Sequence, residues 1–202
     1  MSAYEAVLFD FDGVLIDSEP IHWECWNQIL KRFGLKLDWE TYSEHCIGVA
    51  DRAMLEFLCA RGDPPLDVTL LEPEYPRKKK MFTERMLLSP PISAEVISLI
   101  DSVRKEHQVG VVTSSGRSEV QPILKAAGIL DKLDTVVYGG DVERLKPAPD
   151  PYLLALKRLG VKQALAVEDS KPGIASARAA GCDVVEVKIH CEMWGQVLER
   201  LR

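Results

Sequence analysis

Short apolar runs rich in valine and leucine recur along the chain and predict buried strands. These runs are Ala6–Phe9, Val109–Val112, Thr135–Tyr138, Leu165–Val167 and Val184–Val187. A polar or glycine-containing turn follows each run, which is typical of parallel strands that are covered on both faces.

The segments between the later runs have helical periodicity and stop just before a glycine. We expect helices at Glu119–Ala127, Pro151–Leu159 and Pro172–Ala180, which precede Gly128, Gly160 and Gly181. Strands alternating with helices of this length predict an α/β fold with a parallel sheet and right-handed crossovers.

The first strand is separated from the second by about a hundred residues with helical periodicity and little β signal. Helices are predicted at Ile21–Phe33, Ala53–Ala60 and Arg77–Leu87, and a further one at Ile92–Lys105 leads into the second strand. We therefore expect a helical domain at 16–88, inserted into a core made of 1–15 and 89–202.

Composition narrows the classes of function. The 202 residues include 25 Lys and Arg against 31 Asp and Glu, a formal net charge of −6. This acidic balance argues against a binder of nucleic acid polymers or acidic membranes. No run is long enough to span a membrane, and the opening sequence lacks the features of a signal peptide, so we expect a cytoplasmic protein.

The cysteines are scattered and show no metal-binding spacing. Five are present, at positions 25, 46, 59, 182 and 191. An odd number without a close pair indicates reduced thiols in a cytosol rather than disulfides or a zinc site.

Polar groups follow the predicted strands where ligands gather in an open α/β sheet. Asp10 and Asp12 follow the first strand, Thr113 to Ser115 the second, and Glu168 and Asp169 the fourth, with Lys146 between the third and fourth. Clustered carboxylates repel one another unless a cation lies among them. Oxygen ligands favour a hard ion, most readily Mg²⁺, and the lysine and hydroxyl suit a phosphate.

Four segments in this order resemble the motifs of the haloacid dehalogenase-like superfamily. They are Asp10–Glu19, Val111–Ser115, Lys146–Asp150 and Val167–Gly173. The insert resembles the small helical cap of the β-phosphoglucomutase and phosphoglycolate phosphatase-like branch. The resemblance implies a Rossmann-like catalytic core with a cap.

The resemblance also implies roles for individual residues. Asp10 would be the nucleophile that forms a phosphoaspartate, and Asp12 the general acid and base. Thr113, helped by the backbone N–H of Ser114, would bind the phosphoryl group, and Lys146 would neutralise charge. Asp169 would hold Mg²⁺ together with Asp10, the backbone carbonyl of Asp12, and Glu168 directly or through water.

Further residues are candidates for contact with the substrate. Beside Ser114 and Ser115, we include Arg117, which is close to the second motif and suits an anionic group, and two residues of the insert. His22 lies twelve residues after Asp10, where mutase relatives use a histidine in proton transfer. Arg52 ends Gly48–Arg52, a turn that resembles the mutase recognition turn with the arginine displaced by one residue.

Other features have a structural interpretation. Trp23 and Trp26 are expected to pack within the insert, and Trp194 to form an apolar stripe with Val197, Leu198 and Leu201. The basic run Arg77–Lys80 is expected to be a solvated face.

The sequence therefore predicts a Mg²⁺-dependent phosphatase of a small phosphorylated metabolite such as a sugar phosphate, acting as a monomer or homodimer. A sugar phosphomutase of the β-phosphoglucomutase type is the alternative, favoured by His22 and the Gly48–Arg52 turn. A third hypothesis is a protein that binds its ligand without catalysis. The presence of both Asp10 and Lys146 argues against this hypothesis.

Overall fold

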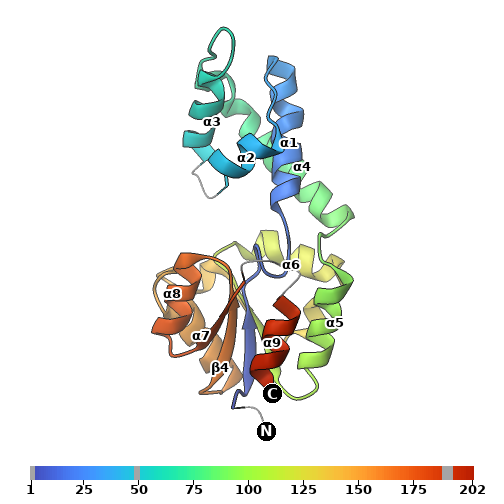
Figure 1. Cartoon of the computed structure of the whole chain (residues 1–202), viewed down its shortest axis with the longest axis vertical. Helices are drawn as coiled ribbons and strands as arrows, with labels where there is room; N and C mark the ends of the chain where they lie inside the picture. Colours follow the sequence, from blue (N-terminus) through green and yellow to red (C-terminus); the bar gives the residue numbers. More distant parts are fainter. Residues whose placement is uncertain (1–2, 48–50, 188–192) are drawn as a thin grey trace. The chain divides into compact units, whose positions relative to one another are not determined.

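The computed structural model describes residues 3–47, 51–187 and 193–202. The chain forms two compact units (Figure 1). The core unit comprises Met1–Asp17 and Pro90–Arg202, and the helical unit comprises Ser18–Ser89. Cys191 and the turn residues 48–50 lie outside the described residues.

A parallel sheet of five strands forms the centre of the core unit. The strands are β1 (Ala6–Phe9), β2 (Gln108–Val112), β3 (Thr135–Val137), β4 (Ala164–Glu168) and β5 (Asp183–Glu186). Their order is β3-β2-β1-β4-β5, so β1 is in the middle. Leu8 pairs with Gly110 on one side and with Ala166 on the other. The whole of β1 is buried, which explains its uninterrupted apolar sequence.

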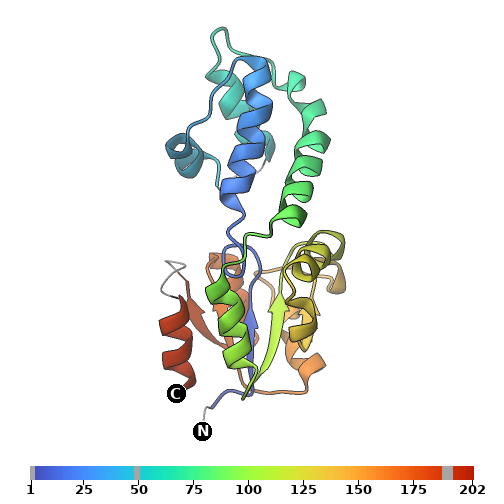
Figure 2. The same ribbon diagram turned by 90° about the vertical axis from the view of Figure 1, so that its right-hand side faces the viewer.

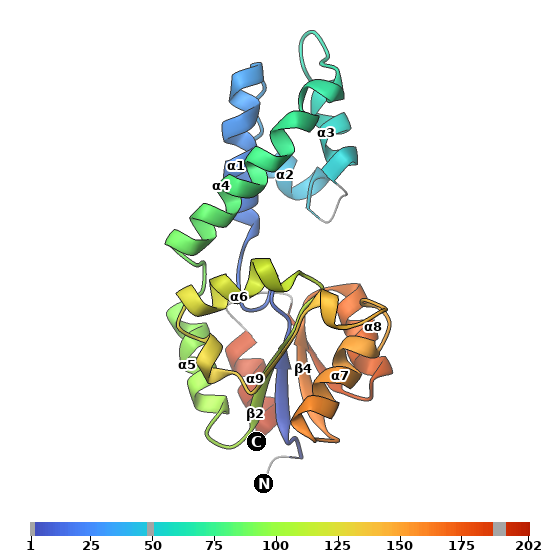
Figure 3. The ribbon, with the colours of Figure 1, turned by 180° about the vertical axis from the view of Figure 1, so that it is seen from behind.

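Helices cover both faces of this sheet. They are α5 (Ala94–Val103), α6 (Arg117–Ala126), α7 (Asp150–Leu159), α8 (Lys171–Ala179) and α9 (Met193–Leu201). Figures 1 and 3 show α5 and α9 together on one face and α7 and α8 together on the other. Gly128, Gly160 and Gly181 follow helices in the left-handed conformation, as the sequence predicts for helix ends.

The helical unit has an apolar core of its own. Its elements are α1 (Glu19–Leu30), η1 (Lys31–Phe33), α2 (Trp39–His45), α3 (Asp51–Ala60), η2 (Val68–Leu70), η3 (Glu72–Glu74) and α4 (Tyr75–Leu88). Trp26 is fully buried among residues of these helices, and the indole of Trp23 donates to the carbonyl of Leu37 at 2.8 Å. The expected packing of both tryptophans is thus confirmed. In Figure 2, α1 and α4 run beside each other.

Two short elements complete the core unit. The 3₁₀ turns η4 (Leu130–Lys132) and η5 (Gly139–Asp141) flank β3. The expected C-terminal helix is present as α9, but its stripe is only partly covered, since Met193 and Val197 are buried while Leu198 is exposed. Predicted element bounds differ from the observed ones by a few residues, mainly at helix beginnings.

Candidate active site

The candidate site lies at the carboxyl ends of β1, the middle strand of the sheet, and of its neighbour β4. Asp10 directly follows β1, and its backbone N–H donates to the carbonyl of Val167 in β4 at 2.9 Å. Glu168 is the last residue of β4 and is fully buried. Adjacent parallel strands therefore bring two carboxylates from distant parts of the sequence to one edge of the sheet.

Lys146 joins these two carboxylates. Its Nζ donates to Asp10 Oδ1 at 2.8 Å, to Glu168 Oε1 at 2.6 Å and to the backbone carbonyl of Val112 at 2.8 Å. Its side chain is 5% exposed. All three ammonium protons thus have an acceptor, which fixes the position of the charge.

Tyr152, which sequence reasoning missed, belongs to the same network. Its hydroxyl donates to Glu168 Oε1 at 2.8 Å, and Lys146 Nζ lies 5.4 Å from the centre of its ring. Ser170 donates to the other oxygen of Glu168 at 3.2 Å. The apolar face of α7 carries Tyr152 into the core, so its sequence pattern is that of an ordinary packing residue.

The site holds more carboxyl groups than positive charges to balance them. Loss of hydration raises the pKa of Asp10 to about 7, with Lys146 lowering it and Glu168 raising it. Loss of hydration also raises the pKa of Asp12 and of Asp169. Burial alone would lower the pKa of Lys146, but Asp10 and Glu168 hold it above its usual value. A single ammonium therefore faces several carboxyls.

A divalent cation would balance the excess negative charge of these carboxyl groups. Oxygen atoms of Asp10, Glu168 and Asp169 lie within 4.8 Å of one another. Three carboxylate oxygens at this spacing are a donor set for a hard cation such as Mg²⁺. The side chain of Asp12 is not in this group, and its predicted role as a ligand through the backbone carbonyl stays a prediction.

The loop after β2 contacts Asp12. The hydroxyl of Ser115 donates to Asp12 Oδ2 at 2.9 Å, and the backbone N–H of Ser115 donates to Thr113 Oγ1 at 3.0 Å. Thr113 is buried, whereas Ser114 is exposed. The hydroxyl group of Thr113, a candidate for binding the phosphoryl group, is therefore held inside this loop by the backbone of Ser115.

Two glycines leave room for the carboxylates. A Cβ on Gly13 would lie 2.0 Å from Asp169 Oδ2, and a Cβ on Gly173 would lie 2.0 Å from Glu168 Oε1. Gly13 also has a φ of +76°, which favours glycine. The side chains of Asp169 and Glu168 therefore pack directly against the backbone, at the turn of Gly13 and at the beginning of α8 respectively.

Replacing Gly173 by alanine is expected to destabilise the protein by about 1–3 kcal/mol, because the methyl group displaces Glu168. The matched control is Gly195→Ala in α9, where no neighbour lies within 4 Å of the added Cβ. In a helix, that change is expected to stabilise by up to about 1 kcal/mol. Urea unfolding measures the change in stability of each variant. Equal changes for Gly173→Ala and Gly195→Ala would contradict the close packing of Glu168 against Gly173.

The structure brings together the candidates in the core unit: Asp10, Asp12, Thr113, Ser115, Lys146, Glu168 and Asp169. Arg117 begins α6, two residues after Ser115. The other candidates, His22 and Arg52, belong to the helical unit.

His22 lies beside a buried lysine. Lys78 Nζ is 2.5 Å from His22 Nδ1, and the imidazole stacks on Phe82 with ring centres 4.0 Å apart. Lys78 is 6% exposed and also lies over the ring of Trp26. The expectation of a solvated basic run is therefore wrong for Lys78, although Arg77, Lys79 and Lys80 are exposed.

His22 is expected to make stability depend on pH. Burial, and then the charge of Lys78, lower its pKa from 6.5 to about 4. Above pH 6.5 the imidazole is neutral in both states, and its contribution to stability is complete. Between 6.5 and about 4 the unfolded chain binds a proton that the folded chain does not, so stability falls as pH falls.

Urea unfolding at pH 7.5 and pH 5 tests this dependence. The wild type should lose more stability between the two conditions than His22→Gln. His45→Gln, at an exposed histidine, is the control and should behave like the wild type. A wild-type pH dependence that persists in His22→Gln would contradict the assignment.

Arg52 is engaged by acidic partners within its own unit. It donates to Glu56 at 3.0 Å and to Glu72 at 2.5 Å, and its side chain is 65% exposed. Gly48, Val49 and Ala50 of the predicted recognition turn lie outside the described residues. The role of Arg52 in substrate binding stays a prediction.

Comparison with known proteins places this site in a family. The haloacid dehalogenase-like hydrolase family matches residues 7–187. The chain belongs to this family. Fructose-1-phosphate phosphatase YqaB of Escherichia coli (strain K12) is 31% identical over 191 residues, covering 92% of this chain and 97% of the relative. Phosphorylated carbohydrates phosphatase of Thermotoga maritima is 29% identical, covering 96% and 89%.

Solved structures share the fold of this chain. A putative β-phosphoglucomutase from Thermotoga maritima aligns with a TM-score of 0.75 at 24% identity, covering 96% of this chain and 99% of that one. A predicted phosphoglycolate phosphatase from Haemophilus somnus 129pt gives 0.74 at 28% identity, covering 93% and 87%. The expected α/β fold and the family are confirmed, as is the expectation of a phosphatase-type enzyme of this family.

Among the described residues, no helix is both long enough and apolar enough to cross a membrane.

Proposed function

We propose that this protein is a Mg²⁺-dependent phosphatase that hydrolyses a small phosphorylated metabolite, a sugar phosphate first of all, through a phosphoaspartate at Asp10. The observation that carries the proposal is the contact of Lys146 with both Asp10 and Glu168, beside an acidic group suited to a cation. The relatives named as sugar phosphate phosphatases match nearly the whole chain.

In this proposal Asp10 attacks phosphorus through a carboxylate oxygen, and the bond from phosphorus to the ester oxygen of the substrate breaks. Asp12 gives a proton to that leaving oxygen. It then takes a proton from the water that attacks the phosphoaspartate, which releases inorganic phosphate and restores Asp10. The hydroxyl of Ser115 holds the Asp12 carboxyl in place for both steps.

The other residues of the site position charge. Lys146 neutralises the negative charge of the phosphoryl group and of the Asp10 carboxylate. Thr113 and the backbone N–H of Ser114 bind the phosphoryl group. Asp10, Glu168 and Asp169 would hold Mg²⁺, which when bound supplies positive charge to the transferred phosphoryl group. We propose that the helical unit acts as a cap that selects the substrate, with His22 and Arg52 as contact candidates.

Phosphate release tests the proposal. The substrate panel contains sugar phosphates, phosphoglycolate, nucleotides and an activated aryl phosphate, each with Mg²⁺ and with EDTA. We expect turnover on at least one ester that stops with EDTA, and a mass increase of one phosphoryl group on the peptide containing Asp10 after acid quenching. Turnover that is indifferent to EDTA, or no turnover by folded protein, would contradict the proposal.

A sugar phosphomutase is the second candidate, because His22 lies twelve residues after Asp10, where mutase relatives use a histidine in proton transfer. A mutase returns the phosphoryl group to a sugar, so an assay with a sugar 1-phosphate primed by its bisphosphate separates the two. If the sugar phosphate is isomerised faster than phosphate is released, the protein is a phosphomutase rather than a phosphatase.

A further inference from the structure

Tyr152 is a buried tyrosine whose hydroxyl has a charged partner. It lies in the first turn of α7, is 0% exposed, and belongs to the same apolar cluster as Val112, Ala155 and Ala166. Phenylalanine would fill this apolar space without burying a hydroxyl, and a buried hydroxyl is costly unless it is hydrogen-bonded. The oxygen of Tyr152 is therefore not required for packing, and its role depends on the group that it contacts.

That group is Glu168, whose carboxylate is held by three donors and by close packing. Its Oε1 accepts from the Tyr152 hydroxyl at 2.8 Å and from Lys146 Nζ at 2.6 Å, and its Oε2 accepts from Ser170 at 3.2 Å. A Cβ on Gly173 would lie 2.0 Å from Oε1 and 2.1 Å from Oε2. A carboxylate oxygen accepts about two hydrogen bonds, so the two donors at Oε1 occupy it fully.

The Tyr152 hydroxyl and the Lys146 ammonium thus share one oxygen of Glu168. Lys146 Nζ also donates to Asp10 Oδ1 and to the carbonyl of Val112, each at 2.8 Å, and it lies 5.4 Å from the centre of the Tyr152 ring. A second donor at Oε1 compensates part of the charge of Glu168. Without the Tyr152 hydroxyl, Glu168 would attract Lys146 more strongly and weaken the contact of Lys146 with Asp10.

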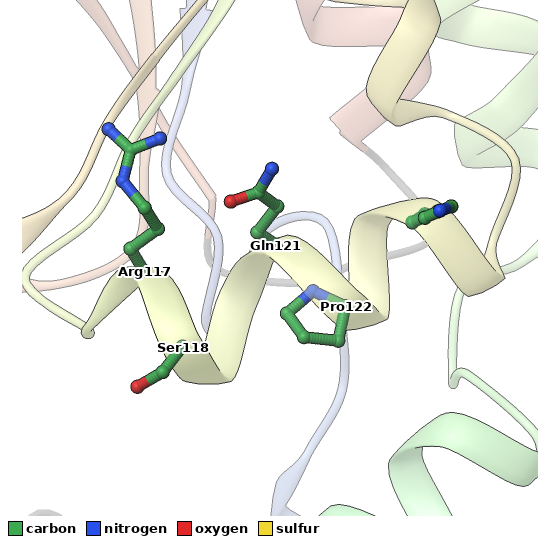
Figure 4. A pocket seen from close by; sticks show the side chains of 5 residues that line it. Arg117, Ser118, Gln121 and Pro122 are labelled. Atoms are coloured by element: carbon green, nitrogen blue, oxygen red, sulfur yellow. The ribbon is translucent and has the colours of Figure 1, made fainter.

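Tyr152 itself is enclosed by protein groups. A hollow of about 670 Å³ on the core unit is lined by five residues of α6, of which Arg117 is the first and Lys125 the last (Figure 4). Tyr152 belongs to α7 and is not among these residues, and no part of it is exposed. Its place allows it to act through Glu168 and Lys146 rather than by contact with a substrate.

We propose that Tyr152 is a positioning residue whose hydroxyl holds the Glu168 carboxylate and keeps the Lys146 ammonium divided between Glu168 and Asp10. This inference rests on the proposed phosphatase function, in which Lys146 faces the phosphoryl group beside Asp10. Because Tyr152 does not touch the substrate, its effect is expected in the rate at which bound substrate reacts and not in substrate binding.

Kinetics of Tyr152→Phe, which removes only the oxygen, test the inference. We expect kcat for phosphate release to fall about 3- to 10-fold with little change in KM, because Lys146 is drawn toward Glu168 and away from the reacting group. The matched control is Tyr4→Phe, which removes a hydroxyl that donates to the Asp183 carboxylate at 2.7 Å, at the amino end of the sheet. Its kcat should equal that of the wild type. An unchanged kcat in folded Tyr152→Phe would overturn the inference.

A double variant tests whether the hydroxyl acts through Glu168. Glu168→Gln removes the charge that Tyr152 and Lys146 share, and it should lower kcat by itself. Adding Tyr152→Phe to Glu168→Gln should lower kcat by less than a further factor of about 2, because the charge that the hydroxyl compensates is already absent. If the losses of the two single variants multiply in full, Tyr152 acts independently of Glu168 and the inference is wrong.

Nuclear magnetic resonance of the protein without substrate or metal tests the same contacts. The three protons of the Lys146 ammonium have acceptors, and the side chain is 5% exposed, so its nitrogen–proton signal should exchange slowly with water in the wild type. Tyr152→Phe should shift this signal and that of the Glu168 carboxyl carbon, whereas Tyr4→Phe should shift neither. If no ester is hydrolysed, the proposed function fails while these signals still decide the role of Tyr152. A Glu168 carbon signal that Tyr152→Phe does not shift overturns the inference.

Discussion

Asp10→Asn is expected to lower phosphate release at least about 10³-fold, because an amide cannot replace the carboxylate as the attacking group. The change keeps the shape of the side chain and an oxygen that accepts from Lys146. The backbone contact of Asp10 with Val167 also remains. The loss should therefore appear in kcat, in an assay of phosphate release with the best substrate of the panel.

The control for Asp10→Asn is Asp131→Asn, which removes an exposed carboxylate from the same unit. Its rate should stay close to that of the wild type. Circular dichroism and urea unfolding show whether the Asp10 variant is folded. A folded Asp10→Asn protein that retains more than about a tenth of the wild-type rate would exclude Asp10 as the nucleophile.

Lys146→Met is expected to destabilise the protein by about 3–5 kcal/mol, because it leaves the buried carboxylates of Asp10 and Glu168 without their cation. The methionine keeps most of the volume of the side chain, so the effect reports on charge. Phosphate release should also fall by about 10²-fold or more, since the transferred group loses a charged donor. Urea unfolding and the phosphate assay measure the two effects.

Mg²⁺ gives this prediction a second test. If the cation binds between Asp10, Glu168 and Asp169, it should restore part of the stability lost in Lys146→Met. Lys162→Met, at an exposed lysine of the same unit, is the control and should change stability by less than about 0.5 kcal/mol. Equal stability of the two variants would show that Lys146 does not compensate the carboxylates.

The sequence predicts all five strands of the core. The signal is clearest for β1, which is wholly buried and therefore has an uninterrupted apolar run, whereas the edge strand β5 is partly exposed and is marked by its valines. The glycines at the helix ends were equally informative, since Gly128, Gly160 and Gly181 take the left-handed conformation. Helix beginnings were predicted less well. The first turn of α6, at Arg117, is polar and exposed, so periodicity detects the helix only after it has begun.

For the candidate site, the sequence indicates the residues of the four motifs. It does not indicate the side chains that hydrogen-bond to them. Tyr152 has the sequence context of a core residue, and only the fold places its hydroxyl on Glu168. Lys78 was expected in solvent because charged residues are seldom buried. Its contact with His22 joins two residues that are 56 positions apart in the chain.

The central place of β1 has a consequence for how the protein is made. Its two neighbours, β2 and β4, leave the ribosome about 100 and about 155 residues after it. Until then an apolar strand with two open edges has no partner, while the helical unit that follows it has a core of its own. We expect the helical unit to fold first on the ribosome, and the newly made β1 to be the segment that chaperones shield.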